Sequence, residues 1–352
     1  MQAVFDGHND VLLRLWEHSR QGRDPVAEFL EGTEAGHIDL PRARAGGLAG
    51  GLCAIFVPSG KLVLKAPDAS GHYETPLAGP VEHAEALAKV LEMAAIAFRI
   101  ERAGGWKVCR STADIRAAIA AGRFAAVLHI EGAEAIGPDL VELETLHAAG
   151  LRSLGPLWSR HNAFGHGVPF AWPKSPDTAP GLTGAGFELV RECDRLGIAI
   201  DLAHITERGF WDVARTTRRP LIASHSNAHA LTTVARNLTD LQLDAIRATS
   251  GIVALNYATI MLRPDGQDDA DTPLSDMVRH VDHLVDRVGI DGVGLGSDFD
   301  GATIPRAIGD AAGTQRLVQA LRDAGYGEGD LAKICRENWL RVLGIAWHEQ
   351  DA

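Results

Sequence analysis

The sequence predicts a (β/α)8 TIM barrel, an α/β fold in which eight parallel strands close into a ring. Three observations predict it: eight short runs rich in Val, Ile and Leu, amphipathic segments between them, and a chain of 352 residues that can bury a large core. Apolar runs that alternate with helical segments indicate parallel βαβ units, and eight such units match this barrel. We therefore expect one domain over residues 1–352 that ends in a helix.

The expected strands are the runs in which Val, Ile and Leu concentrate. In chain order they are Val4–Asp10, Leu48–Val57, Ala125–Gly132, Leu151–Trp158, Ile198–His204, Leu221–Ser226, Gly251–Tyr257 and Val293–Asp298. The segments between them show apolar residues at helical spacing. The expected helices include Pro80–Ala103, Leu140–Ala149, Glu207–Thr216, Thr239–Thr249, Ser275–Val288 and Gly313–Ala324.

Two irregular stretches, residues 59–75 and 159–180, are expected to be long loops that follow strands. Loops of that length on a barrel commonly form lids or substrate walls. A doubly wound open sheet is the competing fold. Against it, no GxGxxG motif follows the first run, and Gly294-x-Gly296 precedes acidic residues that would repel a pyrophosphate.

Composition argues against several classes of function. A formal net charge of −12, without Lys/Arg-rich runs, argues against nucleic-acid and anionic-membrane surfaces. The four cysteines lie far apart without CxxC spacing, so we expect reduced thiols rather than a zinc finger or a disulfide framework. The sequence shows no secretory leader, long apolar span or lipid-anchor tail, which favours a cytoplasmic location.

The first expected strand ends with a histidine and an aspartate, His8 and Asp10, two residues apart. Side chains at i and i+2 of a strand point to the same face. The pair therefore offers an imidazole and a carboxylate together, which are ligands that zinc-like cations prefer. An ordinary turn is the alternative, because Asp-Gly and Asn-Asp are turn-forming pairs.

Chemically related side chains end several other expected strands. Active sites of this fold lie at the carboxyl ends of the strands, so one rim should hold three histidines and three carboxylates: His8, His204, His225, Asp10, Glu131 and Asp298. Singly, each has an ordinary role as a hydrogen-bonded histidine, an Arg-paired glutamate or a helix N-cap. Together, such buried groups must be paired or metal-bound, and two divalent cations bridged by a carboxylate would satisfy them.

A series of different short motifs occurs between residue 6 and about residue 342. They are Asp6-Gly7-His8-Asn9-Asp10, Asp39-Leu40-Pro41-Arg42, Ile130-Glu131-Gly132, Asp201-Leu202-Ala203-His204, Ser224-His225-Ser226, Arg236-Asn237, Gly294–Gly301 and Glu337-Asn338-Trp339-Leu340-Arg341-Val342. As an ordered set, they resemble the membrane-dipeptidase (renal dipeptidase) family of zinc peptidases, within the amidohydrolase superfamily. Without a leader or an anchor tail, the chain resembles a soluble bacterial-type member.

The resemblance implies a site for two Zn²⁺ ions. It assigns His8 and Asp10 to one ion, His204 and His225 to the other, and Glu131 to a bridge between them. Two ions so placed lower the pKa of a shared water and polarise a carbonyl.

The resemblance also assigns roles in the reaction. Asp298 matches the family's aspartate beside the bridging water, and Arg236 matches an arginine that binds the substrate's C-terminal carboxylate. Trp158, Tyr257 and His161 are further expected substrate contacts.

One position departs from the family pattern. Many members carry a histidine just after the fourth strand that faces the oxyanion, and here Trp158 stands there. Arg160, His161 or His166 is an alternative donor, or the metal carries that charge alone.

The implied activity is hydrolysis of dipeptides with a free amino group and a C-terminal carboxylate. L-Xaa-D-Xaa substrates are expected, with some L-Xaa-L-Xaa, attacked by a metal-bridging hydroxide with Asp298 as general acid and base. Hydrolysis of an N-acyl amino acid or a lactam on the same metals is the alternative. A metal-binding protein without turnover is disfavoured because it would not require Asp298. The family habit also favours a homodimer.

Overall fold

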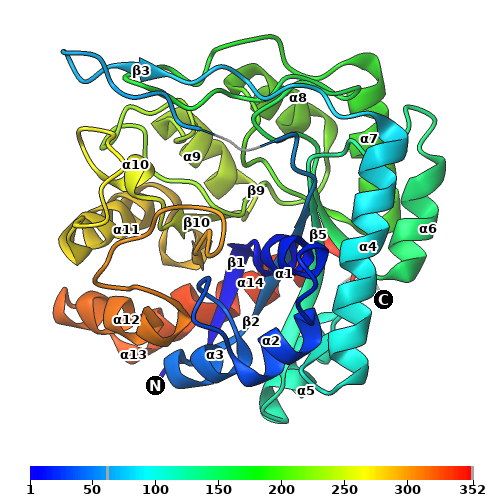
Figure 1. Cartoon of the computed structure of the whole chain (residues 1–352). Helices are drawn as coiled ribbons and strands as arrows, with labels where there is room; N and C mark the ends of the chain where they lie inside the picture. The colour runs from blue at the N-terminus through cyan, green and yellow to red at the C-terminus, as the bar shows by residue number, and fades with distance from the viewer. Residues whose placement is uncertain (61–62, 350–352) are drawn as a thin grey trace.

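Eight parallel strands form the central ring of this computed structural model, which describes residues 1–60 and 63–349 (Figure 1). The ring strands are β1 (Val4–Asn9), β2 (Leu48–Phe56), β5 (Phe124–Glu131), β6 (Leu151–Gly155), β8 (Ala199–Ile200), β9 (Ile222–Ala223), β10 (Ile252–Asn256) and β11 (Val293–Gly296). Each lies within its predicted run, except that β5 starts at Phe124. The predicted barrel fold is confirmed.

Two parallel sheets and two single bridges close the ring. Strands β1, β2, β5, β6 and β8 pair in that order, and β9, β10 and β11 form the second sheet. Asp201 pairs with Ile222 across one gap, and Asn9 pairs with Phe299 across the other. The carboxyl ends of all eight strands consequently meet at one rim. A short strand that the sequence did not predict, β4 (Trp106–Val108), pairs with the first half of β5.

Helices alternate with the strands and cover the outside of the ring (Figure 1). The predicted ones are α4 (His83–Arg102), α6 (Val141–Ala149), α8 (Glu207–Thr216), α9 (Asp240–Ala248), α11 (Leu274–Val288), α12 (Thr314–Asp323) and the C-terminal α14 (Asn338–Ala346). The chain also forms α1 (Val11–Arg20), α2 (Pro25–Glu31), α3 (Leu40–Gly46), α5 (Thr112–Ala120), α7 (Gly184–Leu196), α10 (Thr259–Leu262) and α13 (Glu328–Ala332).

Side-chain caps fix where several helices begin. At α9 the Thr239 hydroxyl accepts the Gln242 N–H, and the Gln242 side chain accepts the Thr239 N–H, which is a capping box.

Over residues 1–60 and 63–349, no helix has both the length and the apolar character needed to cross a bilayer.

The end of the ring opposite the site is filled by α14. Trp339 enters this end, where its ring centroid lies 6.4 Å from that of Phe5 and its indole N–H donates to the Leu295 carbonyl at 3.1 Å. Gly7 makes the space, because a Cβ on it would lie 2.3 Å from the Trp339 ring. Trp339 therefore closes the bottom of the barrel.

The two predicted loops meet over the mouth of the barrel. Strand β3 (Tyr73–Glu74) in the first loop pairs antiparallel with β7 (Ala171–Trp172) in the second, and β3 lies at the top of the molecule in Figure 1. Residues 61–62 of the first loop, and 350–352 at the end of the expected domain, lie outside the described residues. The paired loops form walls above the rim.

Truncation of the barrel floor should destabilise the fold. Trp339 is fully buried, so Trp339→Ala loses its apolar contacts and leaves a cavity, which typically costs about 3–5 kcal/mol of unfolding free energy. Urea denaturation measures it, with Leu241→Ala as control because Leu241 is 67% exposed. A loss no larger than that of the control would contradict this role for Trp339.

Candidate functional site

Six predicted side chains from five strand ends lie together at the rim. His8 belongs to β1 and Asp10 follows it, while Glu131 is the last residue of β5. The others follow β8, β9 and β11; they are His204, His225 and Asp298. The three histidines, Asp10 and Glu131 are all at most 5% exposed. Ring closure therefore gathers residues that are nearly 300 positions apart in the chain.

Glu131 lies between two groups of candidate metal ligands. On one side, His8 Nε2 lies 3.4 Å from Asp10 Oδ2 and 3.8 Å from Glu131 Oε2. On the other side, Glu131 Oε1 lies 3.1 Å from His204 Nε2 and 3.7 Å from His225 Nε2. Within each group the ligand atoms lie within 4.8 Å of one another. These two groups have Glu131 in common, which is the arrangement that a bridging carboxylate requires.

Serine hydroxyls orient two of the histidines. Ser224 donates from its N–H and its hydroxyl to the Asp201 carboxylate, at 2.8 and 2.5 Å. Because a hydroxyl has one hydrogen, the Ser224 oxygen accepts from His225 Nδ1 at 2.7 Å. His225 Nε2 is then left as the unprotonated nitrogen of a neutral ring. Ser159 Oγ lies 2.8 Å from His204 Nδ1, so a serine hydroxyl contacts this ring as well. Such partners fix ring orientation at metal sites.

The site fits divalent cations on the evidence of its own side chains. Burial raises the pKa of both Asp10 and Glu131, and the nearby charge of Asp298 adds to the effect. Both ring nitrogens of His8 are buried without a hydrogen-bond partner among the described residues. Unsatisfied buried groups of either kind cost free energy. Cations held between them would satisfy carboxylates and imidazoles at once.

Two of the gathered residues adopt a backbone conformation that is rare for side-chain-bearing residues. His204 has a φ of 64° and Asp298 a φ of 58°, both in the left-handed region. Each such residue typically costs about 1–3 kcal/mol, and such strain concentrates at functional sites where surrounding contacts enforce it. The sequence pattern could not indicate this strain.

A cleft of about 1000 Å³ opens onto these groups, and Asp10, Glu131, His204 and Asp298 line it. Arg236 also lines the cleft although it is only 3% exposed. Its Nη2 donates to the His225 carbonyl at 3.4 Å, whereas its Nε has no partner among the described residues. Burial lowers the pKa of Arg236 to about 10, so it keeps its charge at neutral pH. The cleft wall therefore presents a cation with spare donor capacity.

Asn256 holds Asp298 and was not singled out from the sequence. Its side-chain amide donates to Asp298 Oδ2 at 2.9 Å. Asn256 is the last residue of β10, so its place at a strand end was the available signal. Ser159 was also missed, and for this residue the sequence offered no signal, because it lies in a loop without periodicity.

Aromatic side chains form one wall of the cleft. Trp158, which was predicted, lines it together with Phe56 and Phe170. The Trp158 ring centroid lies 4.7 Å from that of Phe56, 6.0 Å from that of Phe170 and 5.7 Å from that of His204. An indole therefore packs against a candidate metal ligand.

Two predicted substrate contacts lie away from the cleft. Tyr257 is 1% exposed in the core, with its ring centroid 5.7 Å from that of Phe299. His161 is exposed and lines a separate surface pocket with Glu134 and Glu142. Neither residue is among those that line the cleft, so the structure does not bring these two predicted contacts to the site.

The other alternative oxyanion donors are also engaged elsewhere. Arg160 is fully buried, where its Nε donates to Glu134 Oε1 at 2.8 Å and its Nη2 to the Val57 carbonyl at 2.7 Å. His166 Nδ1 lies 3.1 Å from the Gly181 carbonyl oxygen. Neither residue is among those that line the cleft. Both stabilise the loop that carries Trp158.

Comparison with known proteins agrees with this geometry. The model of the membrane dipeptidase family, peptidase family M19, matches residues 1–351. The chain belongs to this family. It is therefore a hydrolase of the peptidase class, as the motifs predicted, and the ligand groups around Glu131 fit a metallopeptidase.

Three relatives illustrate the similarity. A metallo peptidase from Rhodobacter sphaeroides, crystallised with a phosphinate mimic of the dipeptide L-Ala-D-Ala, is 48% identical with a TM-score of 0.94, over 98% of this chain and 99% of that chain. The dipeptidase AC of family M19 is 49% identical with a TM-score of 0.92, over the same shares. An uncharacterized protein in the pqqA 5′ region of Klebsiella pneumoniae is 47% identical over 247 residues, 70% of this chain and 91% of that protein.

The serine that orients His225 should tune metal binding. Ser224→Ala removes the acceptor of the His225 Nδ1–H, so the affinity for Zn²⁺ should fall about 10–100-fold. Competition with a chromogenic chelator measures it, and Ser70→Ala on the exposed first loop is the control. Equal affinity for Ser224→Ala and the wild type would show that the hydroxyl plays no such part.

Proposed function

We propose that the protein is a binuclear zinc dipeptidase that hydrolyses dipeptides with a free amino group and a free C-terminal carboxylate. The observation that carries the proposal is the pair of ligand groups that share Glu131 on the wall of a cleft that also presents Arg236. The similarity to a metallo peptidase crystallised with a dipeptide mimic supports the substrate class.

His8 and Asp10 would hold one ion, and His204 and His225 would hold the other. Glu131 would contact both ions. Neutral histidines and ionised carboxylates are the ligand forms that Zn²⁺ takes. Two divalent ions in such a site acidify a shared water and polarise a peptide carbonyl when bound. The remaining steps belong to side chains of this chain.

Asp298 is the proposed general base and general acid. Asn256 engages its Oδ2, so Oδ1 is the oxygen that takes the proton of the attacking water. The same oxygen then delivers that proton to the amine that leaves as the peptide bond breaks. The amide of Asn256 keeps the carboxylate facing the cleft through both transfers.

Arg236 is the proposed anchor for the substrate's C-terminal carboxylate. A guanidinium pairs with a carboxylate through two parallel hydrogen bonds, and the unpartnered Nε of Arg236 supplies one such donor. Fixing one end of a dipeptide orients its carbonyl and lowers the entropy lost in the reaction. Trp158 and Phe170 would contact the substrate from the aromatic wall.

The stereochemical preference is proposed as L-Xaa-D-Xaa with some activity on L-Xaa-L-Xaa. The relative's bound L-Ala-D-Ala mimic supports the first class. One domain over residues 1–352, a homodimer and a cytoplasmic location stay predictions.

Removal of the bridging charge should abolish metal binding and turnover together. Glu131→Gln keeps the size of the side chain but removes its charge, so both ions lose a ligand. Elemental analysis should find far less than two zinc ions per chain, and hydrolysis of L-Ala-D-Ala should be abolished. Full zinc content with normal turnover would refute the bridging role.

Loss of the anchor should weaken binding of substrates that carry a carboxylate. Arg236→Met keeps the aliphatic stem, and loss of a buried charge pair costs about 3 kcal/mol, or roughly 100-fold in kcat/KM for L-Ala-D-Ala. The dipeptide amide is the control substrate, because it lacks the anion and should be hydrolysed equally by both forms. An equal loss on the amide would contradict the anchor, and preferred hydrolysis of N-acyl amino acids by the wild type would favour the alternative activity.

A further inference from the structure

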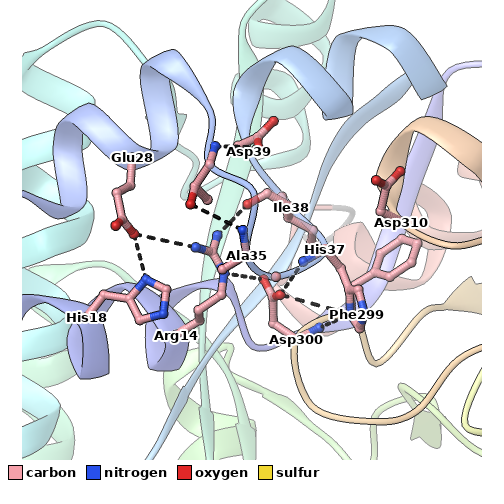
Figure 2. Close-up of polar contacts among 12 residues, drawn as sticks. Arg14, His18, Glu28, Ala35, His37, Ile38, Asp39, Phe299, Asp300 and Asp310 are labelled. Atoms are coloured by element: carbon pink, nitrogen blue, oxygen red, sulfur yellow. Dashed lines mark hydrogen bonds and ion pairs between the residues drawn. The ribbon is translucent and has the colours of Figure 1, made fainter. Parts of the chain in front are cut away.

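A second buried polar cluster lies beside the candidate site, between α1 and the loop after β11 (Figure 2). Arg14 Nε donates to Asp300 Oδ2 at 3.1 Å, and the two side chains are 8% and 1% exposed. Arg14 Nη2 donates to the Ile38 carbonyl at 2.5 Å, and its Nη1 lies 3.7 Å from Glu28 Oε2. None of these residues is needed for the ligand set or for the steps proposed above.

His37 holds Asp300 from its other side. The His37 N–H donates to Asp300 Oδ1 at 2.5 Å, and the Asp300 N–H donates to His37 Nδ1 at 2.9 Å (Figure 2). Because a backbone N–H can only donate, His37 Nδ1 is the accepting nitrogen. Asp300 has a φ of 69°, so these contacts enforce a left-handed backbone at a residue other than glycine.

The cluster connects the two chain segments that carry Asp10 and Asp298. Asp298 is two residues before Asp300, and Arg14 lies one helical turn after Asp10, where its N–H donates to the Asp10 carbonyl at 3.1 Å. The Asp10 N–H in turn donates to the Phe299 carbonyl at 2.8 Å. This is the seam where a single bridge closes the barrel.

We propose that Arg14, His37 and Asp300 form a clamp that positions Asp298 against the ligands on β1. The proposal rests on the proposed function, because it assigns Asp298 its proton-transfer role. The clamp residues are positioning residues: Arg14 ties α1 to the loop, Asp300 transmits the tie to the left-handed turn, and His37 fixes the Asp300 backbone.

Glu28, the second carboxylate beside Arg14, is itself held by other side chains. It forms an ion pair with Arg23, and its Oε2 lies 2.7 Å from His18 Nδ1. Arg14 is therefore held between two carboxylates rather than by one. A buried ion pair contributes little to net stability compared with well-packed apolar residues. The expected benefit is accurate placement, because a displacement of about 1 Å at a reacting group can cost about 100-fold in rate.

The test uses the zinc-loaded full chain and three variants: Asp300→Asn, Arg14→Met and the double variant. Asn tolerates a left-handed backbone as well as Asp does, so Asp300→Asn removes charge without adding backbone strain. We expect kcat for L-Ala-D-Ala to fall about 10–100-fold, with KM changed less than about threefold and zinc content unchanged. The double variant should be no slower than the slower single variant, because both remove the same connection.

A stability-matched control separates positioning from general destabilisation. Ile115→Ala truncates a fully buried side chain on α5 that is not part of the Arg14–His37–Asp300 cluster, and it should lower the unfolding midpoint while kcat stays at the wild-type value. Unchanged kcat in Asp300→Asn, a loss explained by lost zinc, or multiplicative losses in the double variant would each overturn the clamp.

A second readout keeps the clamp distinct from the proposed function. If the zinc-loaded wild type hydrolyses no dipeptide, the proposed function fails, and the clamp is then judged from a crystal structure of Asp300→Asn. A displaced Asp298 carboxylate with the β1 ligands in place supports the clamp, whereas an Asp298 position identical to that in the wild type overturns it.

Discussion

The site depends on one constraint: closure of the strand ring forces carboxylates from distant parts of the chain together, out of water. Asp10 and Glu131 are buried at the rim beside the half-buried Asp298, and Arg236 supplies one positive charge against them. Such an excess of buried negative charge is unfavourable unless cations complete it. His8 and Asp10 form one group of candidate ligands, His204 and His225 form the other, and Glu131 belongs to both groups. The ring geometry and the metal chemistry are therefore two aspects of the same arrangement.

The surrounding hydrogen bonds make that arrangement specific. Ser224 determines which nitrogen of His225 faces Glu131, and Asn256 determines which oxygen of Asp298 is free. The Arg14–Asp300 pair connects the two segments at the closing seam. The apolar layers supply the bulk stability, and these contacts are the ones that we propose to position the candidate ligands and the Asp298 carboxylate. Function here lies in the placement of polar groups on a rigid ring.

The sequence predicted the ring and the gathering of the candidate ligands because both leave local signals. Apolar runs marked the strands, and polar residues at their ends, such as His8 and Glu131, marked the rim. Tyr257 was expected at the site but is buried in the core, because its position just after a strand did not show where its side chain packs. His161 lies in a loop without periodicity, and contacts such as Arg14 with Asp300 join residues 286 positions apart. Only the closed fold shows them.

The central claim is that Glu131 joins two metal ions, and anomalous X-ray diffraction at the zinc edge on the zinc-loaded protein tests it most directly. Two anomalous peaks are expected, one on each side of the Glu131 carboxylate, the first contacted by Asp10 and the second by His204. A third group of ligand atoms, from His8, Asp201 and His225, offers a competing position. A single peak, or a peak at that competing position with Glu131 uncoordinated, would contradict the account.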